Sequence, residues 1–149
     1  MIFVTVGTDR FEEIVKTADE IAPNLGEKLI IQKGNSKYEV KNAESFTFTQ
    51  NIEKYYSKAR LIITHGGAGT IYHLLKKHKK IIGVANLART DTHQTEILEQ
   101  FDKSGNLIWC RNPKDLMQCI IKANSFKFKK YSPPKCEIAK KISEFLNKN

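Results

Sequence analysis

The stretch from Arg60 to Thr70 limits the possible folds of this chain more than any other part of it. A short β-branched run at 61–64 leads into three glycines within four residues, and an amphipathic segment follows at once. This pattern is typical of a strand that ends in a tight glycine turn at the start of a helix. Glycines allow close approach of a ligand, and a helix N-terminus attracts an anion, most often phosphate. A turn that only packs tightly is the alternative; the neighbouring Thr64 and Thr70 favour a phosphate-type ligand.

Strand and helix patterns alternate along the whole chain. The expected strands cover residues 2–6, 28–32, 45–49, 61–64, 81–84 and 107–109. Amphipathic segments with apolar residues three and four apart lie between them and predict helices. Parallel strands need such crossovers, so the alternation predicts an α/β fold that is Rossmann-like. We expect a mostly parallel sheet of about six strands with helices on both faces.

Two of the expected helices carry start signals. Asp9 with Glu12 three residues later predicts a capping box for the first helix. Asn112 followed by Pro113 predicts an N-cap with proline in the first turn. The inner face of the helix that follows is expected to consist of Leu116, Met117, Ile120 and Ile121.

No repeat, low-complexity tract or linker divides the chain, so residues 1–149 are expected to form a single nucleotide-sugar-binding domain. Within it, residues 125–149 are expected to be a basic loop and a C-terminal helix that pack on the domain or dock a partner. The loop carries Phe126, Phe128 and Tyr131, which suit either role.

The positive charge is concentrated near the end of the chain. Residues 111–149 hold ten Lys and Arg against three acidic residues, whereas residues 1–110 hold fifteen against thirteen. A basic tail suits an anionic membrane surface, an acidic partner or nucleic acid, and a solvated lysine-rich face is the alternative.

Composition also argues against several classes of protein. The apolar runs are too short to cross a bilayer, and residues 1–7 lack the basic segment and cleavage site of a signal peptide, so a cytoplasmic location is expected. Cys110, Cys119 and Cys136 form no metal-ligand pattern and are expected to be reduced, without a metal site.

Polar loops follow four of the expected strands, at residues 7–9, 34–36, 65–70 and 86–94. The carboxyl ends of parallel strands meet at one sheet edge, where ligands bind near a reversal of strand order. The sequence therefore predicts a nucleotide site at this edge. Neither the dinucleotide motif G-x-G-x-x-G nor the Gly-Lys-Ser/Thr of a P-loop is present.

Four motifs carry a family resemblance, and they occur in order along residues 2–100: 3–8 with Phe11, Ile31-Gln32-x-Gly34, 65–70, and His93-Gln94-x-Glu96. They resemble two-component glycosyltransferases, whose members include the donor-binding subunit of asparagine-linked glycosylation and small bacterial exopolysaccharide transferase subunits. The chain is similar to the glycosyltransferase family 28 C-terminal domain. The resemblance implies the C-terminal half of a GT-B fold, carried on a separate chain.

The resemblance also implies an activity. The chain would be the donor-binding catalytic subunit of a heteromeric, inverting glycosyltransferase. It would move a hexose or N-acetylhexosamine from a UDP-sugar to a polyprenyl-pyrophosphate-linked sugar, and a membrane-anchored, acceptor-binding subunit would recruit it to the cytoplasmic face of the membrane. No cofactor is expected, and the absence of an Asp-x-Asp pair fits a site that is metal-independent. The general base is left unassigned, because in such a cleft it often belongs to the other half.

The donor-binding residues implied by the resemblance are Gly7, Thr8, His65, Gly66, Gly67, Ala68, Gly69, Thr70, His73, His93 and Gln94. Backbone N–H groups of 66–70 would bind the donor diphosphate. His93 and Gln94 would lie beside the sugar or diphosphate, with ordinary positions at a helix N-terminus as the alternative.

Two departures from the family pattern leave questions open. His73 stands where the family usually has a carboxylate that binds the ribose hydroxyls, and Ala85-Asn86 stands where it has Pro-Arg. An imidazole cannot form a bidentate pair with a diol, so the ribose contact and the donor sugar stay open.

Two other functions are compatible with the chain. A non-catalytic nucleotide-binding or regulatory module is favoured by the histidine at position 73. A nucleic-acid-binding domain is prompted by the isoelectric point of about 9.5. The excess charge lies mainly in one tail and no RNA-binding signature interleaves aromatic residues with it, so no nucleic-acid partner is expected.

Overall fold

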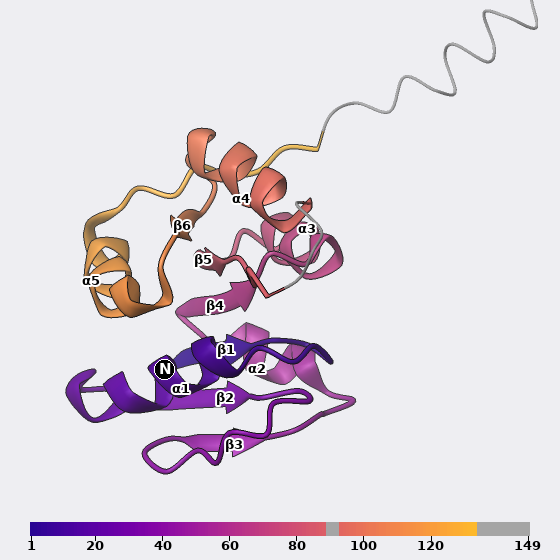
Figure 1. The fold of residues 1–149 in the computed structure, drawn as a ribbon. Helices are drawn as coiled ribbons and strands as arrows, with labels where there is room; N and C mark the ends of the chain where they lie inside the picture. The colour runs from indigo at the N-terminus through magenta and orange to yellow at the C-terminus, as the bar shows by residue number, and fades with distance from the viewer. Residues whose placement is uncertain (89–92, 134–149) are drawn as a thin grey trace, which may run out of the picture.

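The computed structural model describes residues 1–88 and 93–133, in which strands and helices alternate (Figure 1). The strands are β1 (Ile2–Thr5), β2 (Leu29–Gln32), β3 (Glu44–Phe46), β4 (Leu61–His65), β5 (Ile81–Val84) and β6 (Ile108–Cys110). The helices are α1 (Glu12–Ile21), α2 (Ile52–Lys58), α3 (Ala68–Lys76), α4 (His93–Lys103) and α5 (Leu116–Ser125), with short 3-10 turns η1 (Ala22–Asn24) and η2 (Pro113–Asp115). The expected α/β fold class is confirmed.

All six strands lie in one sheet in the order β3-β2-β1-β4-β5-β6, and every neighbouring pair is parallel. The order reverses between β1 and β4, whose register pairs Ile2 with Leu61 and Thr5 with Thr64. Because ligands of such sheets bind at the carboxyl ends beside this reversal, the loops after β1 and β4 occupy the favoured position.

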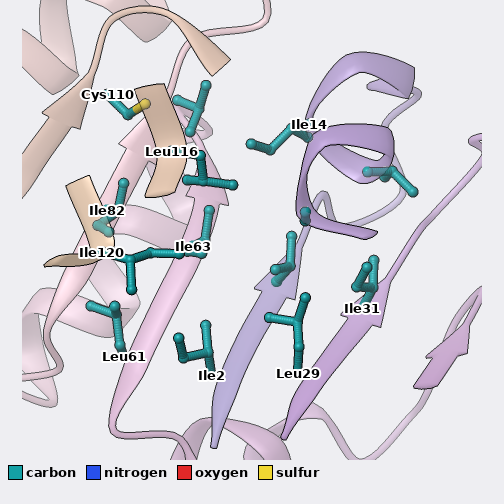
Figure 2. Packing of buried hydrophobic residues seen from close by; sticks show 14 of the residues in the cluster. Ile2, Ile14, Leu29, Ile31, Leu61, Ile63, Ile82, Cys110, Leu116 and Ile120 are labelled. Carbon is teal, nitrogen blue, oxygen red and sulfur yellow. The ribbon is translucent and has the colours of Figure 1, made fainter. Parts of the chain in front are cut away.

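Helices cover both faces of the sheet (Figure 1). On one face, α1 and α5 pack against apolar side chains from β1, β2, β4, β5 and β6; Figure 2 shows Ile14 of α1 with Leu116 and Ile120 of α5 over these strands. On the other face, α2, α3 and α4 cover Phe3, Ile62 and Ile81. Burial on both sides explains why the inner strands β1, β2, β4 and β5 consist mainly of apolar residues.

Several expected strand bounds and one expected inner-face residue differ from the structure. β1 ends at Thr5, β2 begins at Leu29 and β4 extends to His65, each one residue from the expected bound. β3 begins at Glu44 and ends at Phe46, because this edge strand pairs only with β2. β6 runs one residue later than expected. In α5, Ile121 is 61% exposed and Ala123 is buried instead, because the buried side of the helix follows Leu116, Ile120 and Ala123 at i, i+4 and i+7.

The capping box expected for the first helix is absent. Phe11 occupies the N-cap position of α1 without a side-chain cap, and the Asp9 N–H donates to Val6 O in a turn. The Glu12 carboxylate instead accepts hydrogen bonds from Ser36 Oγ and from the N–H groups of Lys37 and Tyr38. By contrast, the expected cap at Asn112 is confirmed, since its side chain accepts from the Lys114 N–H at the start of η2.

A second carboxylate on α1 holds the same loop between β2 and β3. Asp19 is fully buried and accepts hydrogen bonds from the N–H groups of Lys41, Asn42 and Ala43. A buried carboxylate requires such partners, so this side chain ties the loop to the helix that covers the sheet.

The segment after α5 packs on its own domain. The ring centroids of Phe126 and Phe128 lie 4.8 Å apart, and both rings contact the core under α1 and α5. Tyr131 contacts Phe101 on the opposite face of the sheet. These contacts show that the aromatic residues of this segment pack on the domain, and docking of a partner stays a prediction. The expected C-terminal helix lies within 134–149, outside the described residues. None of the helices in the described part of the chain is long and apolar enough to span a membrane.

The Glu12 contacts predict a pH dependence of stability. Hydrogen bonds from the Lys37 N–H, then from Tyr38, Arg10 and Ser36, lower the pKa of Glu12 from 4.5 to about 2. A lowered folded-state pKa gives stabilisation that is complete above pH 4.5 and is lost as the pH falls toward 2. We expect the urea midpoint of the native protein to fall over this interval by more than that of Glu12→Gln. Substitution of the exposed neighbour, Glu13→Gln, should leave the native slope unchanged; equal slopes for native protein and Glu12→Gln would contradict the assignment.

Candidate functional site

An open pocket of about 210 Å³ lies at the carboxyl edge of the sheet, where the N-termini of α3 and α4 meet. It is lined by His65, Gly66, Gly67, Ala68, His93, Gln94 and Ile97. All of these except Ile97 were predicted from the sequence. The structure therefore brings the glycine loop and the His-Gln pair into one pocket, although about 25 residues separate them along the chain.

The electrostatics of the pocket come from backbone groups. Gly67 is the N-cap of α3 without a side-chain cap, and the first α-helical bond of this turn runs from the Ile71 N–H to Gly67 O. The preceding N–H groups of the first turn carry the positive end of the helix dipole. Among the residues that the structure describes, the lining includes no Asp, Glu, Lys or Arg, so within this part of the chain the helix ends, rather than charged side chains, attract an anion.

The three glycines of the loop have different roles. A Cβ atom at position 66 would lie 2.7 Å from Gln94 Cβ and 2.9 Å from Gln94 O, so Gly66 allows the loop to touch α4. A Cβ at position 67 would lie 2.5 Å from His65 Nε2. A Cβ at position 69 would meet nothing within 4 Å. Packing thus accounts for the first two glycines, and only Gly69 leaves open space beside the first turn of α3.

Gly7 brings the loop after β1 to the same place. Its φ of +61° lies in the left-handed region that favours glycine, and its N–H donates to Thr5 Oγ1. A Cβ on Gly7 would lie 3.5 Å from the His65 ring, so the two loops beside the strand reversal are in contact.

Five of the predicted residues lie outside the pocket lining, namely Gly7, whose loop is described above, and Thr8, Gly69, Thr70 and His73. Thr8 is exposed, and its carbonyl oxygen accepts from Asn35 Nδ2. Gly69 and Thr70 belong to the first turn of α3, next to the pocket. His73 lies farther along α3, on the side that faces α2.

The environment of His73 was not foreseen from the sequence. Its Nε2 lies 2.5 Å from Glu53 Oε1, and Lys77 Nζ lies 2.7 Å from Glu53 Oε2. The hydrogen bond from Lys77, followed by that from His73, lowers the pKa of Glu53. The half-exposed Glu53 carboxylate of α2 is therefore ionised. It lies beside position 73 of α3, where the family pattern has a carboxylate.

Asn86 was noted in the sequence only as a departure, and the structure makes it a junction of three segments. Its N–H donates to the side-chain oxygen of Gln94 at 3.0 Å, and its Nδ2 donates to Arg10 O at 3.0 Å. Asn86 and Gln94 are both buried. The loop after β5 thus holds the first turn of α4 against the loop after β1, and Gln94 has a structural contact as well as a place in the pocket.

Among the residues that the structure describes, no group of three His, Cys, Asp or Glu side chains is arranged to hold a metal ion. The pocket offers backbone N–H donors and two imidazoles instead. These groups fit an anion without a bridging cation, and metal-independent binding stays a prediction.

Comparison with known proteins identifies relatives of this chain. The model of the glycosyltransferase family 28 C-terminal domain matches residues 1–148. The chain is 34% identical over 122 residues to the human protein called UDP-N-acetylglucosamine transferase subunit ALG13 and 32% identical over 121 residues to the mouse protein of that name. These matches cover 73% and 72% of this chain but only 11% and 10% of the relatives, so the chain corresponds to about a tenth of their length.

Solved structures show the same fold. The solution structure of ALG13 aligns with a TM-score of 0.62 at 21% identity, over 93% of this chain and 91% of that one. The crystal structure of Acinetobacter baumannii MurG aligns with a TM-score of 0.65 at 18% identity, over 83% of this chain and 41% of that one. At these identities the likeness concerns the fold alone.

The glycine contacts predict opposite effects of one substitution at two positions. Gly66→Ala is expected to lower the free energy of unfolding by about 1–3 kcal/mol, because the new methyl group would meet the Gln94 backbone. Gly69→Ala has open space and is expected to keep or raise stability by up to about 1 kcal/mol, since alanine favours helices. Urea unfolding of both variants measures the difference, and equal losses would show that Gly66 does not set the contact with α4.

Proposed function

The chain belongs to the glycosyltransferase family 28 C-terminal domain family, and on that premise we propose that it is the donor-binding catalytic subunit of a heteromeric, inverting glycosyltransferase. It transfers a hexose or N-acetylhexosamine from a UDP-sugar to a polyprenyl-pyrophosphate-linked sugar. The observation that carries the proposal is the first turn of α3, which has no side-chain cap and has open space at Gly69 beside a pocket at the strand reversal.

In this proposal the donor diphosphate lies against the N–H groups of residues 67–70. Negative charge increases on the β-phosphate as the sugar leaves, so donors already oriented toward it stabilise the transition state more than the ground state. The N-terminus of α4 adds a second helix end to the same pocket. His93 is mostly exposed at the pocket rim, where its ring can contact the sugar or the diphosphate.

Glu53 supplies the ribose contact in this proposal. The family pattern would put a carboxylate at position 73, and the carboxylate beside that position comes from α2. Its two oxygens contact His73 and Lys77, and the Glu53 side chain as a whole is about half exposed. Oxygens held in this way can accept hydrogen bonds from neighbouring hydroxyls of a ribose.

The partner in this proposal is a membrane-anchored subunit that binds the acceptor and recruits this chain to the cytoplasmic face of the membrane. Two observations support it. The human and mouse relatives are named as transferase subunits. The pocket is open on its outer side and is lined by no Asp or Glu, so its described residues offer no carboxylate to act as general base.

The same lack of a carboxylate favours the second candidate, a non-catalytic nucleotide-binding or regulatory module. Both candidates predict binding of UDP, and they differ in whether any partner makes the chain active.

Donor binding is tested at Gly69. Gly69→Asp puts a carboxylate beside the proposed diphosphate, and we expect UDP affinity to fall at least about tenfold in calorimetric titration without added metal. The substitution should not lower the unfolding temperature, because an acidic residue in the first turn of a helix favours its dipole.

Gly69→Asn is the matched control, since it has nearly the same size without the charge and should weaken UDP binding less. Gly67→Asp would be a poorer test because its Cβ would clash with the His65 ring. Native UDP affinity in a folded Gly69→Asp protein would refute diphosphate binding at this turn.

Catalysis is tested by adding the partner. The chain is co-expressed with a candidate membrane-anchored subunit, and transfer from UDP-sugars to a polyprenyl-pyrophosphate sugar is followed by chromatography. We expect product only when both chains are present, and a drop of at least about tenfold with Gly69→Asp. UDP binding without turnover across all partners and donors would support the non-catalytic module instead.

A further inference from the structure

A second pocket, of about 290 Å³, lies beside β6 and α5 and shares no lining residue with the donor pocket. Its volume is close to the lower end of small-ligand sites, about 300 Å³. It is lined by Trp109, Arg111, Asp115, Gln118, Cys119 and Lys122. Nothing in the proposed transferase function uses this pocket.

The pocket contains one member of a pair of thiols. Cys119 on α5 is partly buried and lines the pocket, whereas Cys110 on β6 is fully buried. Figure 2 shows Cys110 among the hydrophobic residues of the core. The Cys110 thiol has two acceptors within reach, the Asn112 carbonyl oxygen at 3.0 Å and the Cys119 sulfur. The pair therefore consists of an accessible thiol and a buried donor that can stabilise it as a thiolate.

The surroundings favour ionisation of Cys119 over Cys110. The hydrogen bond from Cys110 and the charge of Lys122 lower the pKa of Cys119, against opposition from burial and from the carboxylates of Asp115 and Asp102. The contact with Cys119 and burial raise the pKa of Cys110. Because the thiolate is the nucleophile, Cys119 is the reactive member of the pair.

The rest of the lining favours a negatively charged reagent. Arg111 lies over the Trp109 ring at 3.8 Å from the ring centroid, and Lys122 lies on the same helix as Cys119. The described lining thus contains two cations and one carboxylate, that of Asp115. A reagent that carries carboxylates is therefore drawn toward the thiol.

We propose that Cys119 is a site of thiol–disulfide exchange with small anionic disulfides, the class to which oxidised glutathione belongs. The Cys119 thiolate, having lost its proton to solvent, attacks one sulfur of the disulfide, whose S–S bond breaks as the new S–S bond forms. The departing thiolate takes up a proton. One protein thiol and one disulfide thus give one mixed disulfide and one small thiol.

The first experiment measures selectivity for charge. The full chain with Cys136→Ser, which removes the third thiol, is incubated with oxidised glutathione or with the neutral 2-hydroxyethyl disulfide. Mass spectrometry of the peptides then locates and times the adduct. We expect modification at Cys119, and Arg111→Gln should slow the reaction with oxidised glutathione about threefold at low salt while the rate with the neutral disulfide stays unchanged.

Lys114→Gln is the control, because it removes the same charge from an exposed residue of η2 outside the pocket lining. Its rates should equal those of the parent with both reagents. An Arg111→Gln effect that is the same for both disulfides, or modification that does not occur at Cys119, would overturn the proposal.

The second experiment tests the buried donor. The rate of alkylation of Cys119 by iodoacetamide is followed from about pH 6 to 9. Cys110→Ala removes the S–H donor and should shift the profile to higher pH and slow alkylation about threefold near neutrality, whereas Cys110→Ser keeps a donor and should stay close to the parent. Thermal unfolding verifies that both variants are folded. Identical profiles for folded alanine and serine variants would show that Cys110 does not activate Cys119.

Discussion

The contact between the Gly66 backbone and the first turn of α4 is the constraint on which the candidate site depends. A side chain at position 66 would meet Gln94 at less than 3 Å, so only glycine allows the loop after β4 to lie against α4. This contact brings the N-termini of α3 and α4 to one pocket. Two helix dipoles then act on the same volume, and the pocket can attract an anion although no lysine or arginine is among its described lining residues.

Side-chain hydrogen bonds hold the loops around this contact. Asn86 links the loop after β5 to Gln94 and to the Arg10 carbonyl, so hydrogen bonds join three segments at the sheet edge. Glu12 and Asp19 of α1 accept hydrogen bonds from backbone N–H groups of the loop between β2 and β3. The buried Asp19 carboxylate is itself satisfied by these bonds. The loops that form the candidate site are thus joined to one another by hydrogen bonds.

Sequence patterns predicted the helical crossovers and the carboxyl-edge loops because these depend on local periodicity and on glycine. They were less successful for Glu12, which was expected to cap its own helix and instead binds residues 36–38. The sequence alone does not distinguish these two roles, because a carboxylate near the start of a helix can cap that helix or bind a loop elsewhere in the fold. Ile121 shows the same limit, since an apolar residue adjacent to a buried position is not itself buried when only one side of the helix is covered.

The sequence by itself determined the fold class, the family and the segments that line the candidate pocket, because apolar periodicity and ordered motifs are local properties of a chain. Only the tertiary structure decided which partner each polar side chain takes. Position 73 illustrates this: the sequence shows a histidine, whereas the structure places the Glu53 carboxylate of α2 beside it. The thiol pair of Cys110 and Cys119 likewise comes from the packing of α5 on β6. Such contacts depend on how the helices pack on the sheet, and the spacing of residues in the sequence does not specify that packing.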